Sequence, residues 1–268
     1  MKIHAAAVQM SSTLDKEKNV ATASSLVERA AEQGAQFVVL PEFFNCLGEL
    51  AEVAAQAEPV PGPTSEQMGR LAARLNITLL AGSLCERSEE DDATYNTQLL
   101  FDPAGRCLTK YRKMHLFDCC VPGKISVTES NWISAGRDAV TIDTPVGCLG
   151  LATCYDLRFP ELFRQLSRQG MQTLGFASAF MAATGEAHWE VLLRARAIEN
   201  QVYVVAANQY GFHAPGMITY GHSLIADPWG RVLATAAEGD AVVSATLDYE
   251  QLAEIRCNLP ALAHRRLF

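Results

Sequence analysis

This sequence of 268 residues lacks several features that would assign it to a common class of protein. No Cys-x-x-Cys pair occurs among its eight cysteines, which argues against a zinc ribbon or finger, and its six histidines are too scattered to predict a metal site. It has no run of about 18 apolar residues that could cross a membrane. Positive charge is also scarce, because 22 Lys and Arg residues face 30 Asp and Glu residues. The resulting net charge of −8 argues against binding to nucleic acids or to an acidic membrane surface.

The remaining composition is typical of a folded intracellular protein. Hydrophobic residues make up 49% of the chain and charged residues 19%, which allows a large core and disfavours disorder. The N-terminal apolar run is too short for a secretory signal, so we expect a cytoplasmic protein with free thiols, most of them buried and inert. No linker interrupts the sequence, and we expect residues 1–268 to form a single domain.

Hydrophobic periodicity alternates between strands and helices, which predicts a layered α/β fold. Strands are expected at residues 3–9, 37–40, 77–84, 95–101, 106–111, 139–143, 148–154, 173–178 and 202–208. Helices are expected at residues 16–33, 64–75, 160–170 and 188–201, with a short one from about 249. Asp15 should cap the first helix, and Thr64 with Gln67 the second. Three further strands, at residues 222–226, 232–236 and 242–247, are expected to form a meander. Residues 119–131 show little periodicity, and we expect them to form a functional loop.

Two ionisable residues lie where ligands bind in open α/β sheets, beyond the carboxyl ends of strands. Glu42 follows the apolar run Phe-Val-Val-Leu-Pro, and Cys154 follows Leu-Gly-Leu-Ala-Thr. Lys113 comes just after a hairpin strand. A nearby ammonium can lower the pKa of a thiol and stabilise an oxyanion, while a carboxylate moves protons. Taken singly, each residue also fits an ordinary structural role, and spacing alone does not show that the three meet.

Three segments carry a more specific signal, namely Pro41-Glu42-Phe43, the run Tyr111-Arg112-Lys113-Met114-His115-Leu116, and the run from Cys154 to Glu161, Cys-Tyr-Asp-Leu-Arg-Phe-Pro-Glu. They resemble, in order and spacing, the signature motifs of the nitrilase superfamily of carbon–nitrogen hydrolases. The resemblance covers essentially the whole chain. It implies a four-layer αββα sandwich, which in this family pairs into a homodimer or a larger homo-oligomer.

The resemblance also implies roles for individual residues. Glu42 matches the general base and acid, Lys113 the oxyanion stabiliser and Cys154 the nucleophile of a Glu–Lys–Cys triad. The backbone N–H of Tyr155 would be the second oxyanion donor, and Glu129 matches a second glutamate that orients the lysine or positions substrate. The implied reaction is hydrolysis of a small linear amide through a Cys thioester, with release of ammonia and without a metal or cofactor.

Further segments resemble the small-amidase branch of this superfamily, among them residues 122–124, 187–190, 193–199 and 220–223. The resemblance favours deaminated glutathione as the substrate, with ω-amidase activity on α-ketoglutaramate as the first alternative. A nitrilase or an N-carbamoyl hydrolase would use the same triad. Residues 263–268 resemble a tail that reaches across the dimer.

Two readings outside this chemistry remain open. A catalytically silent binding protein could use the same fold, although all three triad positions are filled. A cysteine protease would pair Cys154 with His188 or His222. Near the Cys turn we expect Arg158 and Glu161 to form a structural pair, and we expect helical Arg194, Arg196 and Glu199 to be structural or interface residues.

Overall fold

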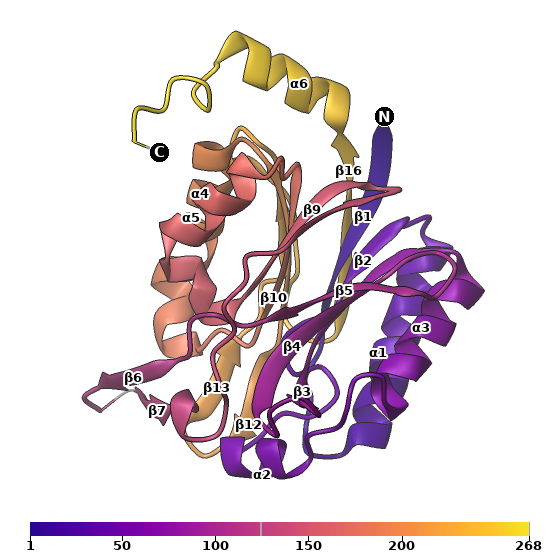
Figure 1. The fold of residues 1–268 in the computed structure, drawn as a ribbon, viewed down its shortest axis with the longest axis vertical. Coiled ribbons are helices and arrows are strands. Elements are labelled where there is room, and N and C mark those ends of the chain that lie inside the picture. Colours follow the sequence, from indigo (N-terminus) through magenta and orange to yellow (C-terminus); the bar gives the residue numbers. More distant parts are fainter. Residues whose placement is uncertain (124, 268) are drawn as a thin grey trace.

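The computed structural model describes residues 1–123 and 125–267, and it shows two six-stranded sheets packed face to face with helices on both outer faces (Figure 1). Lys124, from the branch-specific segment 122–124, and the last residue of the C-terminal tail therefore lie outside the described residues. The architecture is the expected αββα sandwich.

The first sheet has the strand order β16-β1-β2-β3-β4-β5. Its strands are β1 (Lys2–Gln9), β2 (Phe37–Val39), β3 (Thr78–Arg87), β4 (Thr94–Phe101), β5 (Cys107–Arg112) and β16 (Ala241–Asp248). Helices α1 (Lys16–Glu32) and α3 (Pro63–Leu75) cover its outer face. Asp15 caps α1 as predicted, since its side chain accepts a hydrogen bond from the N–H of Lys18 at 3.1 Å.

The second sheet has the order β15-β14-β11-β10-β9-β8. Its strands are β8 (Thr141–Thr144), β9 (Gly147–Thr153), β10 (Thr173–Ser178), β11 (Tyr203–Asn208), β14 (Leu224–Ala226) and β15 (Val232–Thr235). Helices α4 (Pro160–Arg168) and α5 (Ala182–Asn200) cover its outer face. A further helix, α6 (Tyr249–Asn258), follows β16. Among the described residues, no helix is both long and apolar enough to span a membrane.

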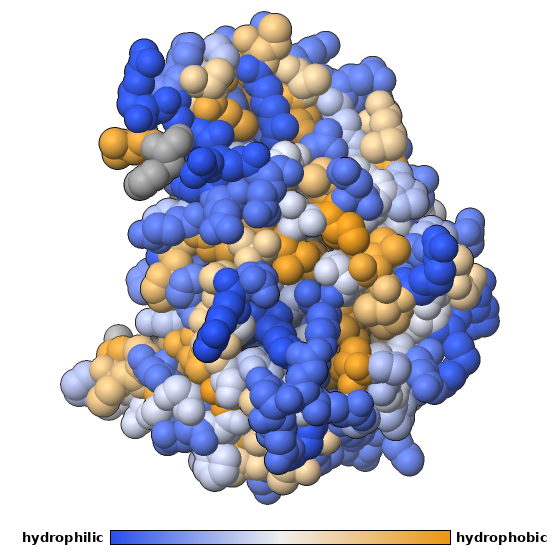
Figure 2. Space-filling view, in the orientation of Figure 1, coloured by the Kyte–Doolittle hydropathy of each residue, from blue (hydrophilic) through white to orange (hydrophobic). Residues whose placement is uncertain are grey.

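Side-chain alternation explains why the central strands appear as unbroken apolar runs. Phe37 and Val39 point into the core between the two sheets, whereas Val38 packs beneath the helices α1 and α3. A strand buried on both faces needs apolar residues at every position. On the face shown in Figure 2, a group of hydrophobic residues lies near the centre, among hydrophilic residues.

Two predictions about strands are wrong. The last strand, β16, does not complete a meander with β14 and β15, because it crosses to the first sheet and pairs antiparallel with β1. Its apolar pattern indicates a strand but not which sheet receives it. The segment expected to be a loop forms a hairpin of β6 (Asp118–Val121) and β7 (Ile125–Thr128), followed by a 3₁₀ turn, η1 (Glu129–Asn131).

Several boundaries and two small elements also differ from expectation. Helix α3 begins at Pro63, where the Gly62 N–H donates to the Ser65 hydroxyl, and the Thr64 hydroxyl is used elsewhere, donating to Glu58. Helix α5 begins six residues earlier than predicted, at Ala182. The pattern missed α2 (Leu50–Ala55) and the hairpin of β12 (Tyr210–Ala214) and β13 (Met217–Tyr220).

The expectation that most thiols are buried is also wrong. All eight are free, but only Cys46 and Cys85 are buried, while Cys107, Cys120 and Cys257 are exposed. Apolar character alone does not place a small residue such as cysteine in the core, because a surface strand or helix accepts it equally well.

Candidate active site

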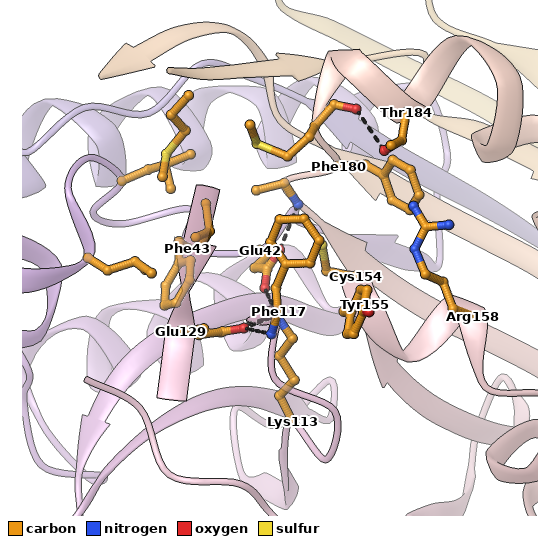
Figure 3. Close-up of a pocket in the computed structure, with 16 residues that line it drawn as sticks. Glu42, Phe43, Lys113, Phe117, Glu129, Cys154, Tyr155, Arg158, Phe180 and Thr184 are labelled. Carbon is orange, nitrogen blue, oxygen red and sulfur yellow. Dashed lines mark hydrogen bonds and ion pairs between the residues drawn. The ribbon is translucent and has the colours of Figure 1, made fainter. Parts of the chain in front are cut away.

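Three strand ends position the three residues of the expected triad around one cavity (Figure 3). Glu42 lies in the turn after β2, Lys113 follows β5, and Cys154 follows β9. Glu42 and Lys113 are each only 2% exposed. The cavity has a volume of about 60 Å³ and also receives Glu129 and Tyr155. The structure therefore brings together all five residues that the sequence singled out.

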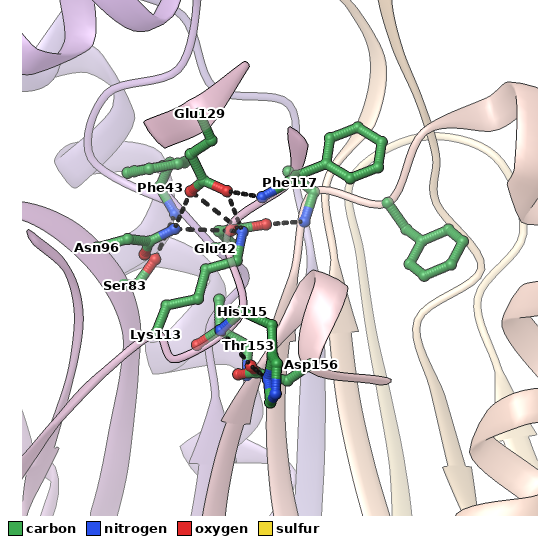
Figure 4. Close-up of polar contacts among 12 residues, drawn as sticks. Glu42, Phe43, Ser83, Asn96, Lys113, His115, Phe117, Glu129, Thr153 and Asp156 are labelled. Carbon is green, nitrogen blue, oxygen red and sulfur yellow. Dashed lines mark hydrogen bonds and ion pairs between the residues drawn. The ribbon is translucent and has the colours of Figure 1, made fainter. Parts of the chain in front are cut away.

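Lys113 is the centre of the polar contacts in this cavity (Figure 4). Its Nζ lies 3.0 Å from Oε1 of Glu42. It also lies 3.1 Å from Oε1 and 2.9 Å from Oε2 of Glu129. The second oxygen of Glu129 accepts a further hydrogen bond, from the backbone N–H of Phe117 at 2.6 Å. Glu129, which is also 2% exposed, thus restrains the ammonium of Lys113.

Glu42 is held by groups from several elements. The Asn96 side chain on β4 donates to its Oε1 at 2.7 Å, and the backbone N–H of Ala179, just after β10, donates to its Oε2 at 2.8 Å. The side chain of Gln209 donates to its backbone carbonyl at 3.0 Å. The carboxylate is therefore fixed by contacts with both halves of the sandwich.

The charges around the thiol differ from the sequence-based expectation. Burial tends to lower the pKa of Lys113, but the charges of Glu129 and Glu42 outweigh it and hold that pKa well above its ordinary value. Burial and the charge of Glu42 raise the pKa of Cys154, and Lys113 offsets this only in part. Lys113 acts on the thiol pKa in the predicted direction, but it does not produce the net lowering that would make a thiolate, because burial and the charge of Glu42 outweigh it. With its pKa raised, the thiol needs a base to take its proton before the sulfur can attack.

A tight turn presents the sulfur. Cys154 has a φ of +48° and opens the 3₁₀ segment η2 (Cys154–Arg158). The backbone N–H groups at the start of such a segment have no carbonyl partners within it, so the N–H of Tyr155 suits an oxyanion donor. Arg196 on α5 supports the turn from outside, since its guanidinium donates to the carbonyl of Leu157 at 2.8 Å.

Asp156 anchors this turn and is a residue that sequence reasoning missed. Its carboxylate is fully buried and accepts from the Thr153 N–H at 2.8 Å and from the Tyr111 hydroxyl at 2.6 Å. It also accepts from the His115 N–H at 3.1 Å, with the His115 ring Nδ1 at 2.7 Å. Tyr111 and His115 flank Lys113, so Asp156 connects the two motifs. Its position in the sequence, two residues after Cys154, could have identified Asp156 as a candidate site residue.

Arg158 enters the same cavity and does not form the expected pair. In the part of the chain that the structure describes it has no carboxylate partner, Glu161 included. Its guanidinium lies over the ring of Phe180, 5.2 Å from the centroid, and contacts the His188 ring at 3.2 Å. Thr184 on α5 lies at the same end of the cavity (Figure 3). One end of the cavity thus carries an unneutralised positive charge.

The histidines of the protease reading do not face the thiol. His188 contacts Arg158, and His222 stacks on Tyr220 and contacts the Tyr220 carbonyl at 2.8 Å. Neither lines the cavity. Within residues 1–123 and 125–267, no group of three or more His, Cys, Asp or Glu side chains is arranged to hold a metal.

The two arginines and the glutamate of α5 make structural contacts, as predicted. Arg196 pairs with Glu199 at 2.7 Å, and Arg194 pairs with Glu190 at 3.1 Å. Arg194 also donates to the carbonyl of Gly230 at 2.7 Å, which ties the β14–β15 turn to the helix.

Comparisons with known proteins agree with this geometry. The family model for carbon-nitrogen hydrolases matches residues 4–257. The chain is 41% identical to the omega-amidase NIT2 of Homo sapiens, over 97% of this chain and 94% of that protein. It is 42% identical to the deaminated glutathione amidase of Homo sapiens, over 97% and 81% respectively. The crystal structure of Saccharomyces cerevisiae Nit3, a member of branch 10 of the nitrilase superfamily, superposes with a TM-score of 0.90 at 35% identity, covering 99% of this chain and 97% of that one.

Proposed function

Since the chain belongs to the carbon–nitrogen hydrolase family, we propose that it hydrolyses a small linear amide through a thioester on Cys154. The observation that supports this mechanism best is the cavity shared by Glu42, Lys113 and Cys154, in which one ammonium contacts two carboxylates. This arrangement supplies a base, a cation and a nucleophile to one reacting carbon.

In the acylation half of the reaction, Glu42 takes the proton from the neutral thiol as the sulfur of Cys154 attacks the amide carbon. Lys113 and the Tyr155 N–H stabilise the oxyanion that forms. Glu42 then gives the proton to the amide nitrogen, the C–N bond breaks, and the amine leaves, as ammonia from a primary amide. The acyl group stays on the sulfur as a thioester.

In the second half, Glu42 takes a proton from a water molecule that attacks the thioester carbon. The C–S bond breaks, the proton returns to the sulfur, and the acid is released. Glu129 keeps Lys113 in place through both halves, because two hydrogen bonds to one carboxylate restrict the ammonium.

The unpaired charge of Arg158 supports a substrate that carries a carboxylate at the end distant from the scissile bond. Deaminated glutathione is our first choice and α-ketoglutaramate the second, because both are ω-amides with an α-keto acid end. The related proteins named above are an omega-amidase and a deaminated glutathione amidase. A nitrile or an N-carbamoyl amine remains the alternative substrate for the same triad.

A substrate panel tests this proposal: deaminated glutathione, α-ketoglutaramate, glutamine, a simple aliphatic amide and a nitrile. Released keto acid is measured for the first two and ammonia for the others, with Cys154→Ala as the inactive reference. Turnover of one keto-amide by the wild type, with none by Cys154→Ala, supports the proposal. Turnover of the nitrile alone identifies a nitrilase. If the folded wild type turns over nothing, a binding protein becomes the better reading.

Arg158→Gln tests the carboxylate site separately. Loss of a charge-assisted hydrogen bond, about 1.5–3 kcal/mol, should raise KM for a carboxylate-bearing amide about 10- to 150-fold. The KM for the neutral aliphatic amide should change by less than about threefold. Equal changes for both substrates would show that Arg158 supports the fold rather than the carboxylate. Arg168→Gln, on the outer helix α4, is the matched control for loss of an arginine.

The chain also carries an apolar patch suited to a second copy of itself. Val191 and Ile198 on α5 are 64% and 50% exposed, and Trp229, in the turn tied to α5 by Arg194, is 55% exposed. We propose that this patch forms a homodimer interface in the cytoplasm. Light scattering should show a dimer for the wild type and a monomer for Ile198→Glu. Phe212→Glu, at a 64% exposed residue of β12 outside the patch, should stay dimeric.

A further inference from the structure

One side chain that contacts the carboxylates of the cavity has a role that the triad and Glu129 do not explain. Asn96 on β4 is fully buried. Its Nδ2 donates to Oε1 of Glu42 at 2.7 Å and lies 3.4 Å from Oε1 of Glu129. Both of these oxygens also accept from Lys113 (Figure 4). The two carboxylates thus share two donors, one charged and one neutral.

The orientation of the Asn96 amide is set by the carboxylates. Its Oδ1 has no hydrogen-bond partner among the residues that the structure describes. The reversed amide would place that oxygen against two anions, so only the present orientation is stable. A side chain whose hydrogen bonds all go to the two carboxylates, and whose oxygen stays unpaired, is placed for those carboxylates rather than for the sheet.

The main chain of Asn96 adds a third connection to the same group. The backbone N–H of Lys113 donates to the Asn96 carbonyl at 2.9 Å. One residue of β4 therefore fixes the start of the segment that carries the ammonium, and contacts both anions that the ammonium neutralises.

We propose that Asn96 is a positioning residue, which holds Glu42 and Glu129 together around Lys113 so that the Glu42 carboxylate stays directed toward Cys154. The inference rests on the proposed function, in which Glu42 is the base. Two buried carboxylates next to one ammonium repel each other. Without the amide donor, the Glu42 carboxylate turns away from the sulfur and no longer accepts the proton of the thiol.

The charged groups that face Asn96 come from three elements and define the pH behaviour. Glu42 follows β2, Lys113 follows β5 and Glu129 opens η1, with the thiol of Cys154 beyond them at the end of β9. The described wild-type cluster of two carboxylates and one ammonium carries a charge of −1. An aspartate at position 96 gives −2, and gaining one proton restores both the charge of −1 and a donor toward Glu42.

The two variants at position 96 should differ in their pH profiles. Asn96→Ala should lower kcat/KM for the amide at least about tenfold with little change in KM. Asn96→Asp should be the less active variant at alkaline pH, and should recover relative to Asn96→Ala as the pH falls and the cluster gains its proton. A purely structural role would lower the stability of both variants without changing the shape of either profile.

Thr97→Val provides the matched control on the neighbouring residue of β4. It removes a 2.6 Å hydrogen bond from a buried hydroxyl to the buried carboxylate of Glu86, outside the cavity. We expect this variant to lose stability and to keep the wild-type pH profile. Thermal unfolding of all variants separates loss of folded protein from loss of rate.

A second measurement needs no substrate. The rate at which iodoacetamide alkylates Cys154, followed by mass spectrometry from pH 6 to 9, reports how readily the thiol loses its proton to Glu42. Asn96→Ala should slow alkylation at neutral pH about tenfold or more, and Thr97→Val should not. If the wild type hydrolyses no amide, the proposed function fails while this assay still tests Asn96. Wild-type kcat/KM or alkylation rates in folded Asn96→Ala, or parallel profiles for the Ala and Asp variants, would overturn the inference.

Discussion

Asp156 allows the sharpest test of how the Cys154 turn is held. The substitution Asp156→Asn changes almost no volume, but it replaces two acceptor oxygens by one oxygen and one NH₂ group. Four donors converge on the carboxylate: the Thr153 N–H, the Tyr111 hydroxyl, and the N–H and ring of His115. At least two of them lose their acceptor in the variant, and they then face a donor in a fully buried site.

The magnitude follows from these contacts. A hydrogen bond to a charged group contributes about 1.5–3 kcal/mol, so loss of two lowers the free energy of unfolding by roughly 3–6 kcal/mol. At about 2 °C per kcal/mol for a chain of this size, Tm should fall by about 6–12 °C. The folded fraction should also lose about 100-fold in kcat/KM, because Cys154 and the Tyr155 N–H are no longer held in the reactive geometry.

Asp102→Asn is the matched control for this prediction. Asp102 is 4% exposed and accepts from the Ala104 N–H at 3.0 Å and the Arg106 N–H at 2.8 Å, in the β4–β5 turn. That variant should lose stability and keep its kcat/KM. Thermal unfolding and amide turnover are measured on both proteins. A Tm of Asp156→Asn within about 2 °C of wild type, with unchanged turnover, would refute the anchoring role.

Two predictions concern pH and stability. Burial tends to raise the pKa of Glu86, but hydrogen bonds from Arg112 and Lys110 outweigh burial and lower that pKa from 4.5 to about 2. The ionised Glu86 side chain therefore stabilises the fold above pH 4.5, and this contribution is lost as the pH falls toward 2. Urea unfolding of Glu86→Gln should therefore show a deficit at pH 7 that shrinks below pH 4.5, and a constant deficit would contradict the ion pairs. Burial raises the pKa of Cys85 from 9.0 to about 12 and also raises that of Cys154. Above pH 9 the unfolded chain binds fewer protons than the folded one, so the free energy of unfolding should fall with rising pH. The fall should be less steep in Cys85→Ala. Thermal unfolding of both proteins from pH 8 to 10.5 measures the two slopes.

The fold was largely predictable because its central strands are buried on both faces. The runs that end before Glu42 and Cys154 are apolar at consecutive positions, and they placed each strand end within one residue. The strand with which a given strand pairs is harder to predict. The residues of β16 pair with β1, more than 230 positions away, and nothing local in either segment specifies that contact. The hairpin of β6 and β7 was missed because its short strands lack a regular alternation.

The site was predictable in its members but not in its electrostatics. Sequence motifs identified Glu42, Lys113 and Cys154, whereas the sharing of one ammonium between two carboxylates exists only in three dimensions. Asn96 lies inside a predicted strand and looks like any polar residue there. Its importance follows from a neighbour 54 positions earlier in the chain, which no spacing rule connects to it.

The two sheets contribute different parts of the proposed reaction centre. Glu42, Asn96 and Lys113 belong to the first sheet and its turns, while Cys154 and the N–H of Ala179 belong to the second. The apolar core between the sheets keeps the Glu42 carboxylate and the Cys154 sulfur in register, together with the hydrogen bonds from the Ala179 N–H to Glu42 and from the Tyr111 hydroxyl to Asp156. A slip of one sheet over the other by about one ångström would separate them while every strand stayed intact. During gentle denaturation, turnover should therefore disappear before the circular dichroism signal changes. Activity is then the most sensitive measure of the relative position of the two sheets.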